Sequence, residues 1–286
     1  MFDLRYHAVS LAAVFIFFVI GILVGVGISG RGVLGERERL SLEADVEQAE
    51  RERDVAERRV AEQEALEEYE RETYPAVMDR RLGDRRVGVL YVGSAEGAVA
   101  TGIQETIDRA DGSLTRMRAL RLPIVTGELL RTVADLPDAP NTVEDLGRAL
   151  GAELVDGGDT PLWDAVATVL VEERDGGSSQ PLDAVVIART VEPQRGQSAR
   201  FLAGLYAGLA GAGVPIVGVE TTDAEPSAIP TYWSHGFSTV DHVDTAPGRV
   251  ALAVLLEDGG PRGAYGTKDE DIPVLPAVDP VAPPVD

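Results

Sequence analysis

The sequence contains no cysteine, and this absence removes several classes of protein at once. Disulfide frameworks, thiolate metal sites, iron–sulfur clusters and cysteine-dependent catalysis all require thiols. Lysine is nearly absent too, since Lys268 is the only lysine among 286 residues. A catalytic lysine is therefore excluded at every other position.

Positive charge is also scarce, with 26 Lys and Arg against 48 Asp and Glu and a net charge of −22. A nucleic-acid-binding protein needs a basic face to meet the phosphates, so we expect no nucleic-acid partner. Aromatic residues make up only 5% of the chain, but 44% of it is hydrophobic. A chain of this length and composition can bury a sizeable core and form one or two folded units.

A long apolar run covers residues 8–30, where Ser10 and Ser29 are the only polar side chains. A helix of about 20 such residues spans the roughly 30 Å core of a bilayer. The run is longer than the roughly 7–15 residues of a cleaved signal peptide, and it lacks a good small-x-small cleavage site. It therefore predicts an uncleaved transmembrane signal anchor at 8–30, after a short flank at 1–7, with the lipid bilayer as a partner.

The predicted topology follows from the length of the chain after this anchor. Long C-terminal domains are exported largely regardless of the charges that flank the helix. We therefore expect a single-pass protein of the cell membrane whose C-terminal domain is extracytoplasmic.

Within the same run, Gly21 and Gly25 form a G-x-x-x-G ridge that allows two helices to approach closely. Glycine is also common in membrane helices for other reasons, so the spacing fits either pairing or simple composition.

Residues 31–75 are expected to form a coiled-coil stalk. No proline or glycine occurs from Glu36 to Thr73, and Glu and Arg dominate. The seam contains Arg53 and Gln63 at core-type positions, so a single solvated helix stays open as the alternative to a dimeric coiled coil. Together with the glycine ridge, the stalk favours a homo-oligomer. The seam follows a 4-3 spacing through Leu42, Val46, Ala49, Arg53, Ala56, Val60 and Gln63.

Residues 83–266 alternate between short apolar runs and segments with helical spacing. The alternation predicts an α/β domain with three layers, in which helices cover both faces of a mostly parallel sheet. The tail at 267–286 is rich in proline and is expected to be disordered. Expected strands cover 87–92, 113–120, 184–188, 214–219 and 237–240. Expected helical segments cover 95–110, 126–173, 199–210 and 248–256.

Motifs for catalysis and cofactor binding are missing. The turn at 93–97 lacks the second glycine of G-x-G-x-x-G, and Glu96 would repel a pyrophosphate there. The sequence also lacks a G-x-x-x-x-G-K-[ST] loop and a G-x-S-x-G elbow. We therefore expect neither an enzyme nor a bound cofactor.

Two histidines, His235 and His242, flank the short strand at 237–240, and Asp241 and Asp244 lie nearby in sequence. Imidazole and carboxylate are ligands that Cu(II) accepts. The two histidines are seven positions apart, which is not the i, i+4 spacing of a helical metal site. A copper site at His235 and His242 and two ordinary loop histidines both stay open.

Two stretches contain specific motifs. The first runs from Leu4 to Phe15, and the second runs from Phe237 to Gly266, with Thr-Val-Asp at 239–241 and Pro-Gly-Arg at 247–249. Both stretches resemble the mycobacterial copper transport protein B (MctB) family. The order of membrane helix, coiled coil and α/β domain matches along nearly the whole chain. The resemblance implies an actinobacterial envelope protein of copper efflux and copper homeostasis that keeps intracellular copper low. Copper is then a transported ion, and the resemblance implies an outer-membrane location.

An alternative function rests on the domain order and on the missing catalytic motifs. In this hypothesis the chain is a membrane-anchored coiled-coil scaffold whose α/β module binds a partner or an envelope ligand.

Overall fold

The structure is a computed structural model that describes residues 4–28, 46, 48–49, 52–53, 56–57, 60, 68, 71–176, 180–257, 260 and 262–278. The chain divides into two compact units, Met1–Leu66 and Glu67–Asp286. Each unit is described by itself below.

The first unit contains helix α1, Leu4–Ile28, whose apolar side chains such as Phe15 and Phe17 are exposed. No helix in the described part of the chain is long and apolar enough to cross a membrane. This finding corrects the prediction of a transmembrane signal anchor at 8–30 and of a single-pass topology.

The predicted stalk at 31–75 lies mostly outside the described residues. Those that are described there, Val46 and Val60 among them, are helical. Both valines are about half exposed, and Arg53 pairs with Glu57 one turn away at 2.7 Å. Charge pairs at this spacing support a single exposed helix. A coiled coil is not shown, so this part of the predicted fold class is also corrected.

The second unit is built on one sheet. Its strands are β1 (Arg86–Val92), β2 (Ser113–Leu120), β3 (Val171–Asp175), β4 (Ala184–Arg189), β5 (Ile216–Val219), β6 (Ser238–Val240) and β7 (Ala264–Tyr265). In the described chain they form a seven-stranded sheet in the order β3-β2-β1-β4-β5-β6-β7. Every neighbouring pair is parallel except β2 and β3, which are antiparallel. The near-continuous burial of β1 and β4 fits a parallel sheet that is covered on both faces.

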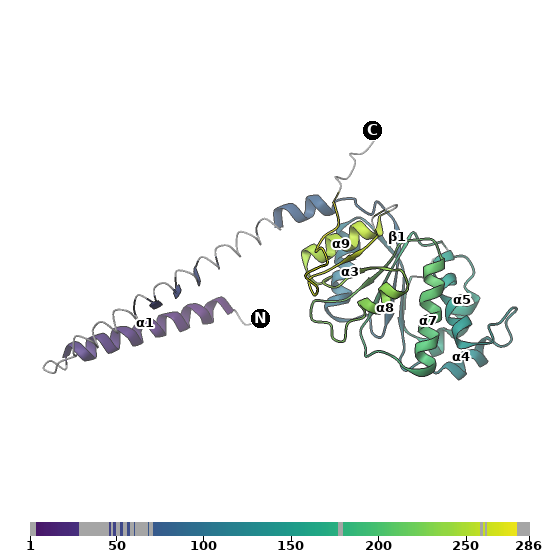
Figure 1. Cartoon of the computed structure of the whole chain (residues 1–286), viewed down its shortest axis with the longest axis horizontal. Helices are drawn as coiled ribbons and strands as arrows, with labels where there is room; N and C mark the ends of the chain where they lie inside the picture. Colours follow the sequence, from purple (N-terminus) through teal and green to yellow (C-terminus); the bar gives the residue numbers. More distant parts are fainter. Residues whose placement is uncertain are drawn as a thin grey trace, which may run out of the picture. The chain divides into compact units, whose positions relative to one another are not determined.

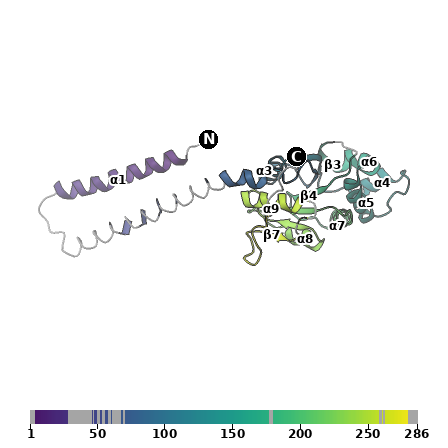
Figure 2. The same cartoon turned by 90° about the horizontal axis from the view of Figure 1, so that it is seen from above.

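Helices cover the two faces of this sheet, and Figures 1 and 2 show α3 and α9 on one side and α4, α5 and α7 on the other. The helices are α3 (Gly97–Arg109), α4 (Thr126–Val133), α5 (Val143–Asp156), α6 (Pro161–Leu170), α7 (Gly196–Gly211), α8 (Ile229–Ser234) and α9 (Ala246–Leu256).

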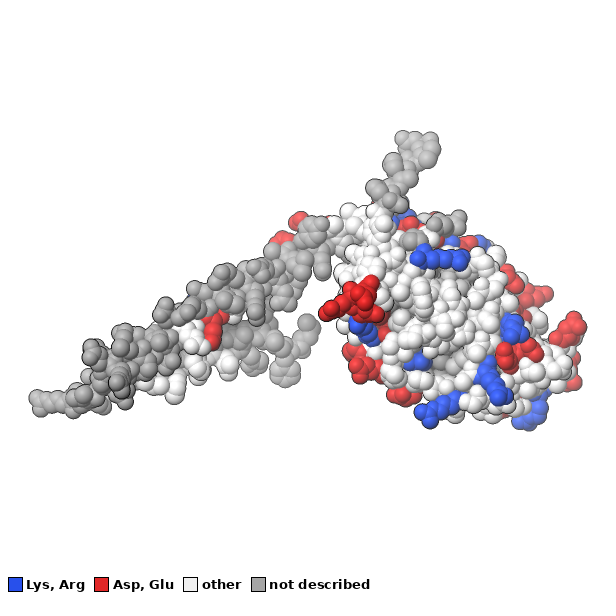
Figure 3. Space-filling model, in the orientation of Figure 1, with Lys and Arg blue, Asp and Glu red and all other residues white. Residues whose placement is uncertain are grey.

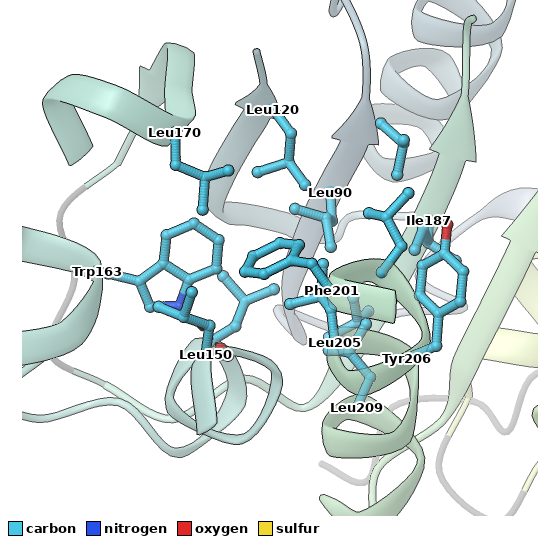
Figure 4. Packing of buried hydrophobic residues seen from close by; sticks show 14 of the residues in the cluster. Leu90, Leu120, Leu150, Trp163, Leu170, Ile187, Phe201, Leu205, Tyr206 and Leu209 are labelled. Carbon is cyan, nitrogen blue, oxygen red and sulfur yellow. Dashed lines mark hydrogen bonds between the residues drawn. The ribbon is translucent and has the colours of Figure 1, made fainter. Parts of the chain in front are cut away.

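Each face of the sheet has its own hydrophobic core. On the α5–α7 face, Phe201 and Leu205 of α7 point toward Leu90 and Ile187 of the sheet, as Figure 4 shows. Trp163 lies in the same core, where its indole N–H donates to the Leu150 carbonyl at 2.9 Å. The α3–α9 face buries alternate strand residues, so neighbouring residues of one strand belong to different cores.

Helices α5 and α7 pack backbone against backbone. Gly147 and Gly151 lie on α5, and a Cβ on either would meet the backbone of α7. On α7, a Cβ at Gly204 would meet the Glu144 backbone, and a Cβ at Gly208 would meet the α5 backbone as well. Glycine is required at these four positions because no side chain fits between the two helices.

The α/β part of the predicted fold class agrees with the structure, including the mostly parallel sheet. Apolar runs located β1, β4 and β5 because these strands are buried, and an imperfect alternation of apolar residues located β2. Strand β3 was predicted as the end of a helical segment at 126–173. Only Val171 of β3 is buried and its other four residues are exposed, so no apolar pattern marks it. Helix α8 and strand β7 were missed because they have six and two residues.

Candidate functional site: a crevice at the carboxyl edge of the sheet

The strand order reverses direction between β1 and β4. From β1 the chain crosses to β2 on one side, and from β4 it proceeds to β5 on the other. Helix α3 follows β1 on one face and α7 follows β4 on the opposite face. The carboxyl ends of the two strands are therefore splayed apart, and ligands of open α/β sheets bind at such a switch point.

A pocket of about 840 Å³ occupies this position. Its walls come from the start of α3, the turn after β2, the turn after β4 and the loop after β5. Apolar side chains such as Val99, Leu122 and Val191 lie beside the polar side chains of Arg189 and Thr190. Pockets of roughly 300–1,000 Å³ accept small organic molecules, so the crevice has the size of a ligand site.

One wall of the crevice is formed by the turn after β4. The Arg189 guanidinium donates to the Pro226 carbonyl at 2.6 Å and thereby joins this wall to the loop after β5. The Thr190 hydroxyl donates to the Ser94 carbonyl at 3.0 Å and joins it to the turn after β1. These bonds fix three of the loops that surround the crevice.

The opposite wall, residues 220–228, is held by a buried carboxylate. Glu220 is 2% exposed, and its Oε1 accepts from the Ser227 hydroxyl at 2.8 Å and from the Lys268 ammonium at 2.7 Å. Its Oε2 accepts from the Ala228 backbone N–H at 2.6 Å. Lys268 also donates to the Ala224 carbonyl at 2.9 Å. The buried charge of Glu220 is thus paired and hydrogen-bonded, as a carboxylate in the interior requires.

Asp241 anchors the segment that carries this lysine. Its carboxylate is 6% exposed and accepts the backbone N–H of Thr267 at 2.8 Å and of Lys268 at 3.1 Å. The backbone of Gly266 lies so close that a Cβ there would collide with the Asp241 carboxylate. Thr267 and Lys268 were predicted to belong to the tail. In the structure they contact the domain through Asp241, which follows β6, and Lys268 also contacts Glu220, which follows β5.

His242 lies beside Asp241 and is fully buried. Its Nδ1 is 3.1 Å from the Asp241 carboxylate. Burial lowers the pKa of His242 below its ordinary value, which the Asp241 charge opposes. The imidazole is therefore neutral near pH 7, and a neutral ring that donates Nδ1–H to Asp241 leaves Nε2 as an acceptor. No described residue forms a hydrogen bond of ordinary geometry with Nε2, although the Val274 backbone raises the pKa of the ring.

His235 has different surroundings. It ends α8, its Nδ1 lies 2.9 Å from the Thr231 carbonyl, and its ring packs edge-on against Tyr206 at 5.2 Å between centroids. The structure thus gives the two predicted metal residues separate partners. In the described part of the chain, no group of three or more His, Cys, Asp or Glu side chains is placed to hold a metal ion. A copper site at His235 and His242 stays a prediction.

The second stretch that carries the family resemblance builds the corner between β6 and α9. Gly248 is required there because a Cβ would collide with the His242 backbone. Arg249 donates to the Asp244 carbonyl at 2.9 Å and to the Tyr74 hydroxyl at 3.2 Å, and it lies 3.4 Å from the Glu105 carboxylate. These residues act structurally by joining α9, α3 and the helical residues 71–78.

The crevice residues were missed by the sequence analysis. Arg189, Glu220 and Lys268 lie far apart in the chain and belong to no spacing motif. The only available signal was positional, since Arg189 and Glu220 directly follow the predicted strands at 184–188 and 214–219. The carboxyl ends of parallel strands share one edge of a sheet, so the strand assignment could have placed both residues at this edge.

These features define a doubly wound α/β domain with a ligand-sized crevice at its switch point. The family model described as "Copper transport outer membrane protein, MctB" matches residues 1–276, so the chain belongs to the MctB family. The resemblance found in the sequence is therefore confirmed. No curated protein matches the chain. At the level of the family, membership supports a role in copper transport and homeostasis in the cell envelope.

Proposed function

We propose that this chain lowers intracellular copper as a protein of the cell envelope, with copper as the transported ion. The family match over residues 1–276 carries the proposal, because it includes both the helical N-terminal part and the whole sheet. We further propose that the chain works without catalysis, as expected for a transport-related family.

A direct copper contact is proposed at Asp241 and His242. Metal-binding histidines commonly donate their second ring N–H to a carboxylate, which fixes the tautomer and presents the other nitrogen. The 3.1 Å contact between His242 Nδ1 and Asp241 has this form. His235 is tested by a separate variant, because its Nδ1 already contacts the Thr231 carbonyl.

The first experiment measures cell-associated copper in a deletion strain, its parent and the complemented strain, all grown with raised copper. We expect the deletion strain to accumulate copper and complementation to restore the parental amount. Equal copper in the three strains would contradict the proposed function.

The second experiment complements the deletion with His242→Gln, His235→Gln or the double variant. Loss of copper tolerance with His242→Gln alone is expected if the Asp241–His242 pair handles the ion. Glutamine keeps the side chain at position 242 neutral and polar, and immunoblots confirm that each variant accumulates. Full copper tolerance in the double variant would contradict the proposed direct copper contact. It would not contradict the copper-transport role that family membership supports.

A further inference from the structure

We propose that the crevice at the carboxyl edge of the sheet binds a small organic anion whose carboxylate or phosphate head meets Arg189. This site is separate from copper transport, and it gives the α/β domain a ligand of its own.

Arg189 supplies the charge that recognises the anion. Its side chain is half-buried in the crevice wall and donates one hydrogen bond, to the Pro226 carbonyl. No carboxylate of the described residues forms an ion pair with it. A guanidinium has five N–H donors in a planar fork, so donors remain for the two oxygens of a carboxylate or phosphate.

The nearest buried acid does not cancel this charge. Glu220 lines the same crevice, but Lys268 neutralises it at 2.7 Å and two further donors occupy its oxygens. The other acids of the lining, Glu192, Asp223 and Glu225, are exposed at the rim, where water screens them. The inner wall therefore carries the positive charge of Arg189.

The backbone adds polar N–H groups to the same wall. Helix α3 begins at the crevice, and the side chain of its N-cap residue Glu96 does not cap the helix but is exposed to water, which screens its negative charge. The first N–H groups of a helix have no partner within it and carry partial positive charge. Ala98 and Val99 of α3 line the crevice directly.

Recognition at this site is local. On the face that Figure 3 shows, acidic and basic side chains are interspersed over the α/β domain, so no broad basic field attracts anions. Val99, Leu122 and Val191 give the pocket an apolar wall, and its volume of about 840 Å³ exceeds that of an inorganic ion. The ligand class is therefore an anionic head on a compact apolar frame.

Isothermal titration calorimetry of the full-length chain tests the site with three probes: phenyl phosphate, benzoate and benzylamine. We expect saturable binding of at least one anion, with a dissociation constant of about 1 mM for molecules of this size. The two anions distinguish a phosphate head from a carboxylate head. Benzylamine has the same apolar frame with a positive charge and is expected not to bind.

Arg189→Gln is expected to weaken anion binding at least about tenfold, which corresponds to the loss of one charged hydrogen-bonded contact. Arg148→Gln is the matched control, because Arg148 is exposed on α5 and pairs only with Glu144 and Asp145. Arg189→Lys keeps the charge without the planar fork, and it replaces Arg189→Gln if that variant does not fold.

Three results would overturn the proposal: no saturation by either anion at about 10 mM, tighter binding of benzylamine, or equal anion binding by Arg189→Gln and the wild type. Copper accumulation does not enter this test, so its outcome is independent of the proposed function.

Discussion

Helix α1 and the α5–α7 pair both carry glycines four residues apart. On α5 and α7, a Cβ at Gly147 or Gly204 would collide with the backbone of the facing helix. On α1, a Cβ at Gly21 or Gly25 would meet no described atom within 4 Å. The same spacing therefore faces a partner helix in one region and meets no described atom in the other.

This difference shows what a glycine spacing establishes. It removes side chains from one stripe of a helix, and this is necessary for close approach. Whether another helix occupies the stripe depends on neighbours that are distant in sequence. From the sequence, the G-x-x-x-G spacing was interpreted for α1 only, and the same spacing on α5 and α7 was not considered. Self-association through Gly21 and Gly25 stays a prediction.

The largest expected effect comes from filling the α5–α7 contact. Gly204→Ala is predicted to lower the free energy of unfolding by about 3 kcal/mol, because the added methyl meets the Glu144 backbone, which has no freedom to rotate away. Urea unfolding followed by tryptophan fluorescence measures this, since Trp163 is buried beside α5.

Gly211→Ala is the matched control, because it lies on the same helix and a Cβ there meets nothing within 4 Å. We expect it to be neutral or to stabilise by up to about 1 kcal/mol. Equal destabilisation by both variants would show that helix α7 tolerates no alanine, and the contact with α5 would not be the cause.

The second largest effect is expected from the ion pair between Lys268 and Glu220, which no sequence motif indicates. Lys268→Ala leaves the Glu220 carboxylate buried without its cation, and we predict a loss of about 2 kcal/mol of unfolding free energy. Glu270→Gln removes an exposed charge nearby and is expected to change little. Hydrogen exchange at the Ala228 amide, which donates to Glu220, should accelerate in Lys268→Ala and recover in Lys268→Arg.

A smaller effect, on the pH dependence of stability, is expected from His242, whose surroundings differ from those of His235. Burial lowers the pKa of His242 in the folded chain, so protons bind the unfolded chain more readily. The associated stability is complete above the ordinary pKa of about 6.5 and is lost as the pH falls below it. Unfolding free energies measured from pH 8 to pH 5 should fall less steeply in His242→Gln than in the wild type. Parallel curves for these two proteins would refute the assignment.

The smallest effect is expected in α1. Gly21→Ala with Gly25→Ala should change the unfolding free energy of the α/β domain by less than about 0.5 kcal/mol, because a Cβ at either position meets no described atom. Sedimentation of the full-length variant and the wild type tests self-association separately. A smaller assembly in the variant would show that the ridge has a partner helix, as it does in α5 and α7.

Apolar patterning was sufficient for the buried strands and failed where burial is partial. Val87–Val92 and Ala184–Ala188 are apolar because helices cover both faces of the sheet there. Strand β3 has one buried residue and is defined by its backbone pairing with β2. For the candidate site, the sequence located the strand ends but not the crevice, because side chains of four separate loops form it.

The sequence by itself determined the α/β class, the mostly parallel sheet and the membership of the MctB family, because hydrophobic periodicity and motif residues are local properties of the chain. Only the tertiary structure decided that Lys268 neutralises Glu220, that His235 and His242 have separate partners, and that Arg189 faces a crevice. These pairings join residues up to 48 positions apart. They depend on the strand order of the sheet, which no local pattern in the sequence records.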